Sequence, residues 1–133
     1  MTRSTSIVTR TVALLLAPTA TSCASSQLEL AVAEPSGIVI PEHRSGVLQI
    51  RNGCAYLTSG NMRSLIVWPH GTSISADGRS IMTGRQKLRR NGEPLKFSGG
   101  DISIEAFPRT SISYKVMKRC GGPYILASDL PGG

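Results

Sequence analysis

From Gly46 onward, the chain alternates between short apolar runs and closely spaced turn residues. Asn52-Gly53 is a strong hairpin signal, and ADG, NGEP, SGG and CGGP indicate further turns. The runs between the turns have strand length and recur roughly every ten residues. They are GVLQI, CAYLT, SLIVW, TSIS, SIMT, QKLRR, LKF, ISIEAF, ISYKV and YILAS. This pattern predicts an all-β fold, a small closed or partly open β-barrel that is OB-like or sandwich-like.

Three segments carry more specific expectations. TSISYKVMKRC is the run that can form a helical turn or two. Gly99-Gly100 lacks the context of a phosphate-binding loop, so it predicts a bulge or a tight corner.

Residues 65–67 form an apolar run too continuous for a strand with one solvated face, which places it near the barrel centre. Trp68 follows, just before Pro69, where it either packs at the barrel mouth or contacts a ligand such as a sugar ring.

The N-terminus has the layout of a secretory signal peptide over residues 1–22. Arg3 and Arg10 carry positive charge, and the apolar run TVALLLAPTA precedes a series of small residues. The apolar run is too short to span a bilayer, which takes roughly 20 residues. Pro18 would also end a buried core helix early, so export is the better interpretation.

Cys23 lies where such a signal ends, and two kinds of processing fit it. ATSC is similar to the lipobox of bacterial lipoproteins, in which the cysteine receives lipid, although Ala20 stands where leucine is usual. Alternatively, an ordinary signal peptidase cuts after Ala24. We expect lipidation of Cys23 and therefore a membrane-anchored protein of the cell envelope. The alternative is a soluble periplasmic or extracellular protein.

Both kinds of processing leave Cys54 and Cys120 as an even pair. In an exported chain this predicts a disulfide that ties the first hairpin to the last strand, closes a loop of about 65 residues and contributes about 4 kcal/mol. A zinc site is a poor alternative because there is no CxxC spacing, and only His43 and His70 accompany the two cysteines. No metal and no other cofactor is predicted.

The mature chain divides into two parts. Residues 23–45 show no helical or strand periodicity, because it is interrupted by small residues and by Pro35, Gly37 and Pro41. This predicts a flexible tether. Residues 46–133 then form the β-barrel domain. A core of this size is marginal on its own, and a disulfide would support it.

The ordered series NGCAYL, LIVWPHG, FSGGD and RCGGPYILAS resembles a pattern of small bacterial exported proteins and lipoproteins of unknown function. In that pattern Gly-Cys, Trp-Pro, Gly-Gly and Cys-Gly-Pro-Tyr recur in this order. The resemblance covers about residues 46–128 and implies export, a small β-fold and paired cysteines, but no catalytic residue. The segment GRQKLRRNGEPL departs from that pattern, so the basic surface there is particular to this chain.

A catalytic constellation is weakly indicated. His70 has Ser73, Ser75 and Asp77 close in sequence, but no G-x-S-x-G motif marks a nucleophile. A solvated turn histidine is the simpler interpretation. A small secreted hydrolase with its site near His70 stays the alternative function.

Charge points to a partner. Arg3 and Arg10 leave with the signal peptide, so 13 of the 15 Lys and Arg residues remain against 8 Asp and Glu, a net charge of 13 − 8 = +5. A basic run contains Arg85, Lys87, Arg89 and Arg90. It either protects an edge strand from aggregation or contacts an anionic envelope polymer or lipid headgroups.

Nucleic acid is not an expected partner because no aromatic residue is interleaved with the basic run. The sequence therefore predicts an envelope lipoprotein or secreted protein that acts as a non-enzymatic binding or structural module. Trp68 and the basic run are its predicted ligand or surface contacts.

Overall fold

The computed structural model describes residues 12–14, 28–35, 40–84 and 86–130. Cys23, Arg85 and the predicted signal peptide apart from residues 12–14 lie outside the described residues. Within the described part, the all-β prediction is confirmed, since strands dominate and there is one short α-helix. No helix in that part is long and apolar enough to cross a membrane.

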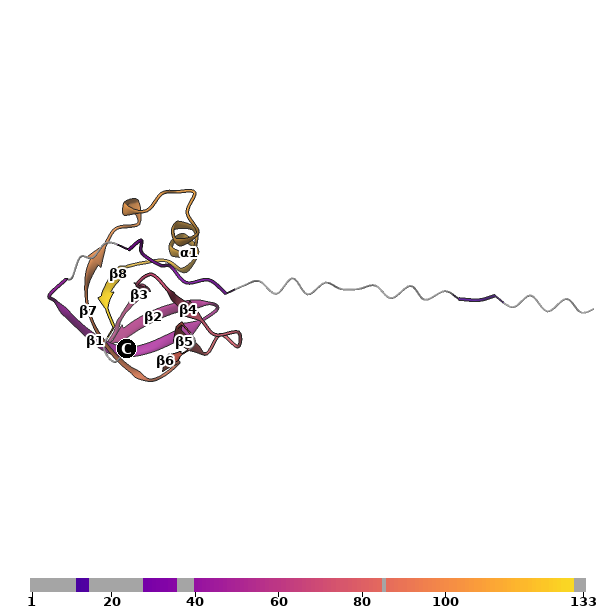
Figure 1. Cartoon of the computed structure of the whole chain (residues 1–133), viewed down its shortest axis with the longest axis horizontal. Helices are drawn as coiled ribbons and strands as arrows, with labels where there is room; N and C mark the ends of the chain where they lie inside the picture. The colour runs from indigo at the N-terminus through magenta and orange to yellow at the C-terminus, as the bar shows by residue number, and fades with distance from the viewer. Residues whose placement is uncertain (1–11, 15–27, 36–39, 85, 131–133) are drawn as a thin grey trace, which may run out of the picture.

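Five strands close a barrel in the order β1-β2-β3-β8-β7 (Figure 1). Their bounds are β1 His43–Arg51, β2 Cys54–Ser59, β3 Met62–Val67, β7 Pro94–Ile102 and β8 Tyr124–Asp129. β1, β2 and β3 form an antiparallel meander, β8 runs parallel to β3, and β7 pairs antiparallel with both β8 and β1. This closed five-stranded barrel is the small barrel that the sequence predicts.

The predicted hairpin signal at Asn52-Gly53 is confirmed as the turn between β1 and β2. Both residues have positive φ, 51° and 75°, which is the geometry of a two-residue turn with Asn-Gly. The prediction for Gly99-Gly100 is also confirmed, because the β7–β8 register shifts between Ser98 and Gly99. A Cβ on Gly99 would collide with the carbonyl oxygen of Leu126. Only glycine permits this close approach of the two backbones.

A second sheet in the order β4-β5-β6 follows β3. Its strands are β4 Thr72–Ile74, β5 Ser80–Thr83 and β6 Gln86–Arg90. Ile81 is fully buried, and Ile74 and Leu88 pack against the same core cluster that fills the barrel. The small sheet is therefore part of the same domain, and β6 is an edge strand, as the charged run predicts.

The barrel interior is filled by large apolar side chains. The core cluster contains Leu48, Leu57, Ile66, Trp68, Leu95, Phe97 and Ile125. Leu65 and Val67 point to the opposite face of β3, where they are buried in a second cluster with Val116 and Met117 of the helix. The prediction that residues 65–67 are covered on both sides is confirmed.

The helix α1, Ile112–Cys120, lies over the outer face of the barrel beside β3 and β8 (Figure 1). A short 3-10 turn, η1 Ile104–Ala106, precedes it. The Ser111 hydroxyl accepts a hydrogen bond from the Tyr114 amide and so caps the first turn of α1. The helical exception predicted from TSISYKVMKRC is confirmed.

The predicted tether is partly wrong. Leu30 and Ala31 are buried, and the backbone of this segment pairs with Trp68 through Ala33 N–Trp68 O and Trp68 N–Ala31 O hydrogen bonds of 2.8 Å. The barrel also begins at His43 rather than Gly46. The sequence does not show that this segment is buried, because two or three apolar residues are too few to show a period. Their burial nevertheless stabilises the fold. We call residues 28–35 the arm.

Ser113 of α1 fixes the arm, because its hydroxyl donates to Val32 O at 2.7 Å and accepts from Val32 N at 3.0 Å. Ser113→Ala should destabilise the protein by about 1–3 kcal/mol, since both backbone groups of Val32 lose their partner. Chemical denaturation measures the loss of stability. Amide exchange in the variant should become faster at Val32 than in the wild type, with a smaller change in β2, which would place the effect in the arm. Unchanged exchange at Val32 would contradict this role of Ser113.

Candidate functional site

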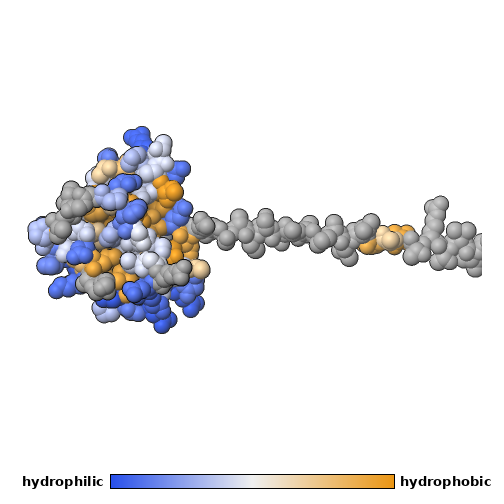
Figure 2. Space-filling view, in the orientation of Figure 1, coloured by the Kyte–Doolittle hydropathy of each residue, from blue (hydrophilic) through white to orange (hydrophobic). Residues whose placement is uncertain are grey.

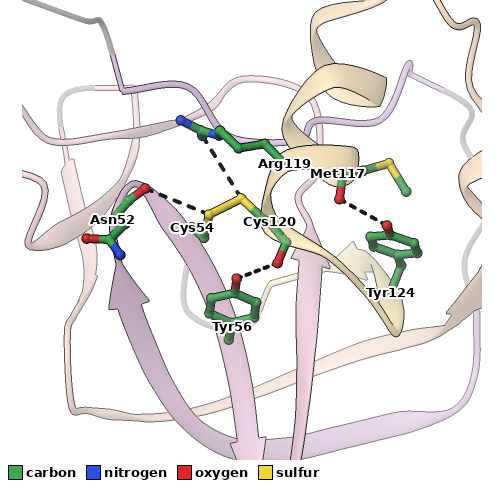
Figure 3. Close-up of a disulfide and its surroundings, with 7 residues drawn as sticks. All are labelled: Asn52, Cys54, Tyr56, Met117, Arg119, Cys120 and Tyr124. Carbon is green, nitrogen blue, oxygen red and sulfur yellow. Dashed lines mark hydrogen bonds between the residues drawn. A yellow bond between two sulfur atoms is a disulfide. The ribbon is translucent and has the colours of Figure 1, made fainter.

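The predicted disulfide between Cys54 and Cys120 is confirmed, with Cα atoms 5.8 Å apart (Figure 3). Cys54 begins β2 and Cys120 ends α1, so the bond joins the first hairpin to the helix rather than to the last strand, which corrects that part of the expectation. The Tyr56 hydroxyl donates to Cys120 O at 2.8 Å, and the Tyr124 hydroxyl donates to Met117 O at 2.9 Å. The C-terminal end of α1 is therefore held in place by one covalent bond and two tyrosine hydroxyls.

An open cleft of about 700 Å³ lies beside this disulfide. Three arginines from three elements line it: Arg51 at the end of β1, Arg63 near the start of β3 and Arg119 in the last turn of α1. The other lining residues are Asn52, Cys54, Tyr56 and Cys120. Within the described part of the chain, no carboxylate contributes to this lining. We call it the arginine cleft.

Packing positions two of these arginines. The guanidinium carbon of Arg63 lies 4.4 Å from the centre of the buried Tyr56 ring, in a cation–π contact. The Arg119 guanidinium lies over the hairpin turn, 3.7 Å from where a Cβ of Gly53 would be. It also lies 4.0 Å from the Cys120 sulfur (Figure 3).

No ion pair among the described residues neutralises the charges of the cleft. Among the described residues, the ion pairs are those of Arg44 with Glu42 and Asp101 at 3.4 and 3.5 Å. Arginines 51, 63 and 119 are all exposed and take no part in them. Three unpaired guanidinium groups around one opening create a positive potential that attracts anions.

The predicted basic run lies elsewhere, on β6. Lys87 and Arg90 are exposed, whereas Arg89 is half-buried and donates to Leu88 O at 2.7 Å. Lys87, Arg90 and Arg79 line a second pocket of about 450 Å³ together with Asp77. We call this the β6 pocket. The run therefore presents Lys87 and Arg90 to solvent, and its described residues do not line the arginine cleft.

Asp77 is the carboxylate of the β6 pocket. A hydrogen bond from the Ser75 hydroxyl, and then one from the Arg79 amide, lower the pKa of Asp77 below its ordinary value. Asp77 is therefore charged at neutral pH and offsets one of the three cations. The β6 pocket is less positive than the arginine cleft.

Trp68 has no exposed surface and lies inside the barrel core. Of its two predicted roles, this position fits packing and leaves no indole surface for a ligand. Its Nε1 atom is buried without a hydrogen-bond partner among the described residues. The predicted ligand contact at Trp68 is corrected accordingly.

His70 is exposed and lines a third opening, of about 460 Å³, between the arm, β4 and the start of α1. The serine hydroxyls that share this lining are mostly engaged: Ser113 bonds Val32, and Ser111 caps α1. Asp77 bonds Ser75 in the separate β6 pocket. No hydrogen bond within the described ranges joins His70 to a serine or an aspartate, so these residues do not assemble the alternative catalytic arrangement.

No group of three or more His, Cys, Asp or Glu side chains in the described part of the chain is placed to hold a metal ion. Comparison with family models, with curated proteins and with solved structures finds no match for this chain. The site must therefore be interpreted from its own chemistry.

The arginine cleft was missed from the sequence because residues 51, 63 and 119 are far apart along the chain. A usable signal was present. Arg51 lies three residues before Cys54, and Arg119 directly precedes Cys120. Pairing of the two cysteines brings the backbone beside both arginines into one region of the fold.

Proposed function

We propose that this protein is an exported, non-enzymatic binding module of the cell envelope whose arginine cleft binds an anionic ligand. One observation carries the proposal: three guanidinium groups from three elements meet in one opening that lacks a lining carboxylate among the described residues. Guanidinium groups form paired hydrogen bonds with carboxylates, phosphates and sulfates, which makes these the expected ligand groups.

The dimensions of the cleft favour an acidic polymer over a small ion. A cleft of about 700 Å³ is within the range of pockets for drug-sized ligands, far above the size of one phosphate. It is also open, so a chain can enter and leave while successive anionic groups contact the three arginines. An acidic envelope polysaccharide has this chemistry.

Export is supported by the disulfide as well as by the signal layout. Disulfides form and persist in oxidising compartments, and the Cys54–Cys120 bond joins two elements that are distant in sequence. Anchoring through a lipid on Cys23 is part of the proposal. Cleavage after Ala24 would instead give a soluble periplasmic or extracellular protein with the same cleft.

The hydrolase alternative has less support. The groove beside His70 contains hydroxyls that already bond backbone groups, and the nearest predicted aspartate bonds Ser75 in another pocket. A nucleophile needs a base within hydrogen-bond reach, and no such pair involves His70 among the described residues.

Binding of acidic polysaccharide probes tests the arginine cleft. Calorimetry with polygalacturonate and with heparin should show binding that weakens as salt is added. Arg51→Gln, Arg63→Gln and Arg119→Gln should each weaken binding about tenfold, since each removes a charged hydrogen-bond donor. Lys96→Gln, an exposed cation of β7 opposite Ser45, is the matched control and should bind like the wild type. Equal affinity for the wild type and all three arginine variants would refute the proposed site.

A further inference from the structure

The N-terminal end of the described arm lies where three openings meet. Leu28 packs between two turn glycines: its methyl carbons lie 2.9 Å from where a Cβ of Gly53 and a Cβ of Gly78 would be. Gly53 neighbours Asn52 of the arginine cleft, and Gly78 lies between Asp77 and Arg79 of the β6 pocket. Leu28 itself lines the groove beside His70.

This edge of the molecule has a strip of apolar surface. The groove is lined by Leu28, Leu30, Val32, Ala33, Ile74 and Ile112. Ile112 at the start of α1 is 56% exposed. Figure 2 shows apolar surface gathered beside the position where the described arm ends, next to α1. Contiguous exposed apolar surface is a feature of interaction sites.

Cations adjoin the apolar strip. Ile74 of the groove is followed directly by Ser75 of the β6 pocket, which presents Arg79, Lys87 and Arg90. The carboxylates of this edge are Asp77 and, on the arm, Glu29 and Glu34. The three arginines of the cleft lie on the other side of Leu28. Arg79, Lys87 and Arg90 are matched in number by these three carboxylates, so the net positive charge of the edge comes from the three arginines of the neighbouring cleft.

We propose that this edge docks on an anionic lipid bilayer. The docking face consists of Leu28, Ile74 and Ile112 with Arg79, Lys87 and Arg90. Apolar side chains that enter the headgroup region, next to cations that contact anionic headgroups, are the two components of peripheral membrane binding.

The position of Cys23 favours a bilayer as the occupant. Leu28 lies five positions after Cys23, and a chain of that length spans at most about 18 Å. A lipid on Cys23 would therefore hold the docking face close to the membrane surface. Tethering through Cys23 rests on the lipidation that is part of the proposed function. The apolar and basic surfaces of the docking face are independent of that lipidation.

Partition of the full chain between buffer and vesicles tests the docking face. Vesicles of phosphatidylglycerol with phosphatidylcholine are compared with vesicles of phosphatidylcholine alone. The N-terminal segment, with Arg3 and Arg10, is the same in every variant, so a change in the ratio of the two partition coefficients on substitution reports the docking face. Each cation at the surface raises this ratio about fivefold, so Lys87→Gln with Arg90→Gln should lower it about 30-fold. Lys96→Gln is the matched control and should leave the ratio unchanged.

Ile112→Asp tests the apolar half of the face. It should lower partition onto phosphatidylcholine vesicles about tenfold, and partition onto phosphatidylglycerol vesicles about fivefold more, because the added carboxylate is repelled by the anionic headgroups. The variant should fold, because an acidic residue in the first turn of a helix is favourable. Met62→Asp is the matched control, since Met62 is 68% exposed at the opposite end of β3 from Val67. Its partition should equal that of the wild type.

The outcomes separate this inference from the proposed function. Loss of vesicle binding in the face variants, with polygalacturonate binding intact, supports the docking face. Unchanged vesicle binding in those variants overturns it, and if they lose polygalacturonate binding instead, the face belongs to the polymer. Vesicle binding without any polysaccharide binding by the wild type would leave the docking face standing and refute the cleft.

Discussion

Trp68→Ala should destabilise the protein by about 4 kcal/mol, because it removes the largest fully buried side chain from the barrel interior. Trp68 belongs to the core cluster with Phe97, Leu48 and Ile66. A cavity of this size inside a closed barrel cannot collapse without breaking strand pairing. Small domains have only about 5–15 kcal/mol of stability in total, so the variant should be close to unfolding at room temperature. Urea denaturation followed by circular dichroism measures the loss.

Trp68→Phe is the comparison that separates volume from polarity. The indole Nε1 is buried without a partner in the described part of the chain, so its removal relieves the cost of an unsatisfied donor. We therefore expect Trp68→Phe to cost much less than Trp68→Ala. Fluorescence of the wild type gives an independent check, since this is the chain's single tryptophan. Native emission at the wavelength of solvent-exposed tryptophan would contradict the buried position.

Local patterns were sufficient to predict the barrel. Asn52-Gly53 specifies its turn through the left-handed conformations that both residues adopt, and the apolar run 65–67 specifies a strand covered on two faces. Gly99-Gly100 likewise predicted the bulge in β7. Each of these signals is contained within a few neighbouring residues, which is why the sequence alone shows it.

The arm and the arginine cleft depend on contacts between distant residues, so no local pattern shows them. Val32 is fixed by Ser113, which is 81 positions away, and the cleft combines arginines from β1, β3 and α1. The basic run of β6 had the stronger sequence signal because its cations are consecutive. The closely spaced cations of β6 could be recognised as an edge strand from the sequence. The three arginines of the cleft are distant in sequence, so only the folded structure shows that they lie together.

Loss of the Cys54–Cys120 disulfide should cost about 4 kcal/mol of unfolding free energy, because the bond closes a loop with a sequence separation of 66. The double variant Cys54→Ala with Cys120→Ala is preferred to a single substitution, which would leave a free thiol able to pair between molecules. Chemical denaturation of the oxidised wild type, the reduced wild type and the double variant should give one higher value and two similar lower ones. Equal stability of all three would contradict a structural role for the bond.

The same double variant should also lose affinity for anions. This result would distinguish a local role of the disulfide at the arginine cleft from its effect on overall stability. The end of α1 carries Arg119, and without the disulfide it is held to the barrel mainly by the Tyr56 and Tyr124 hydroxyls. Greater motion of Arg119 weakens its contact with a ligand in the cleft, so binding of polygalacturonate should fall about tenfold under conditions where the variant is still folded. Arg119→Gln is the control that loses affinity with little change in stability, since its exposed side chain forms no ion pair among the described residues. A disulfide-free protein that remains folded and binds with wild-type affinity would show that the cleft does not depend on the covalent bond.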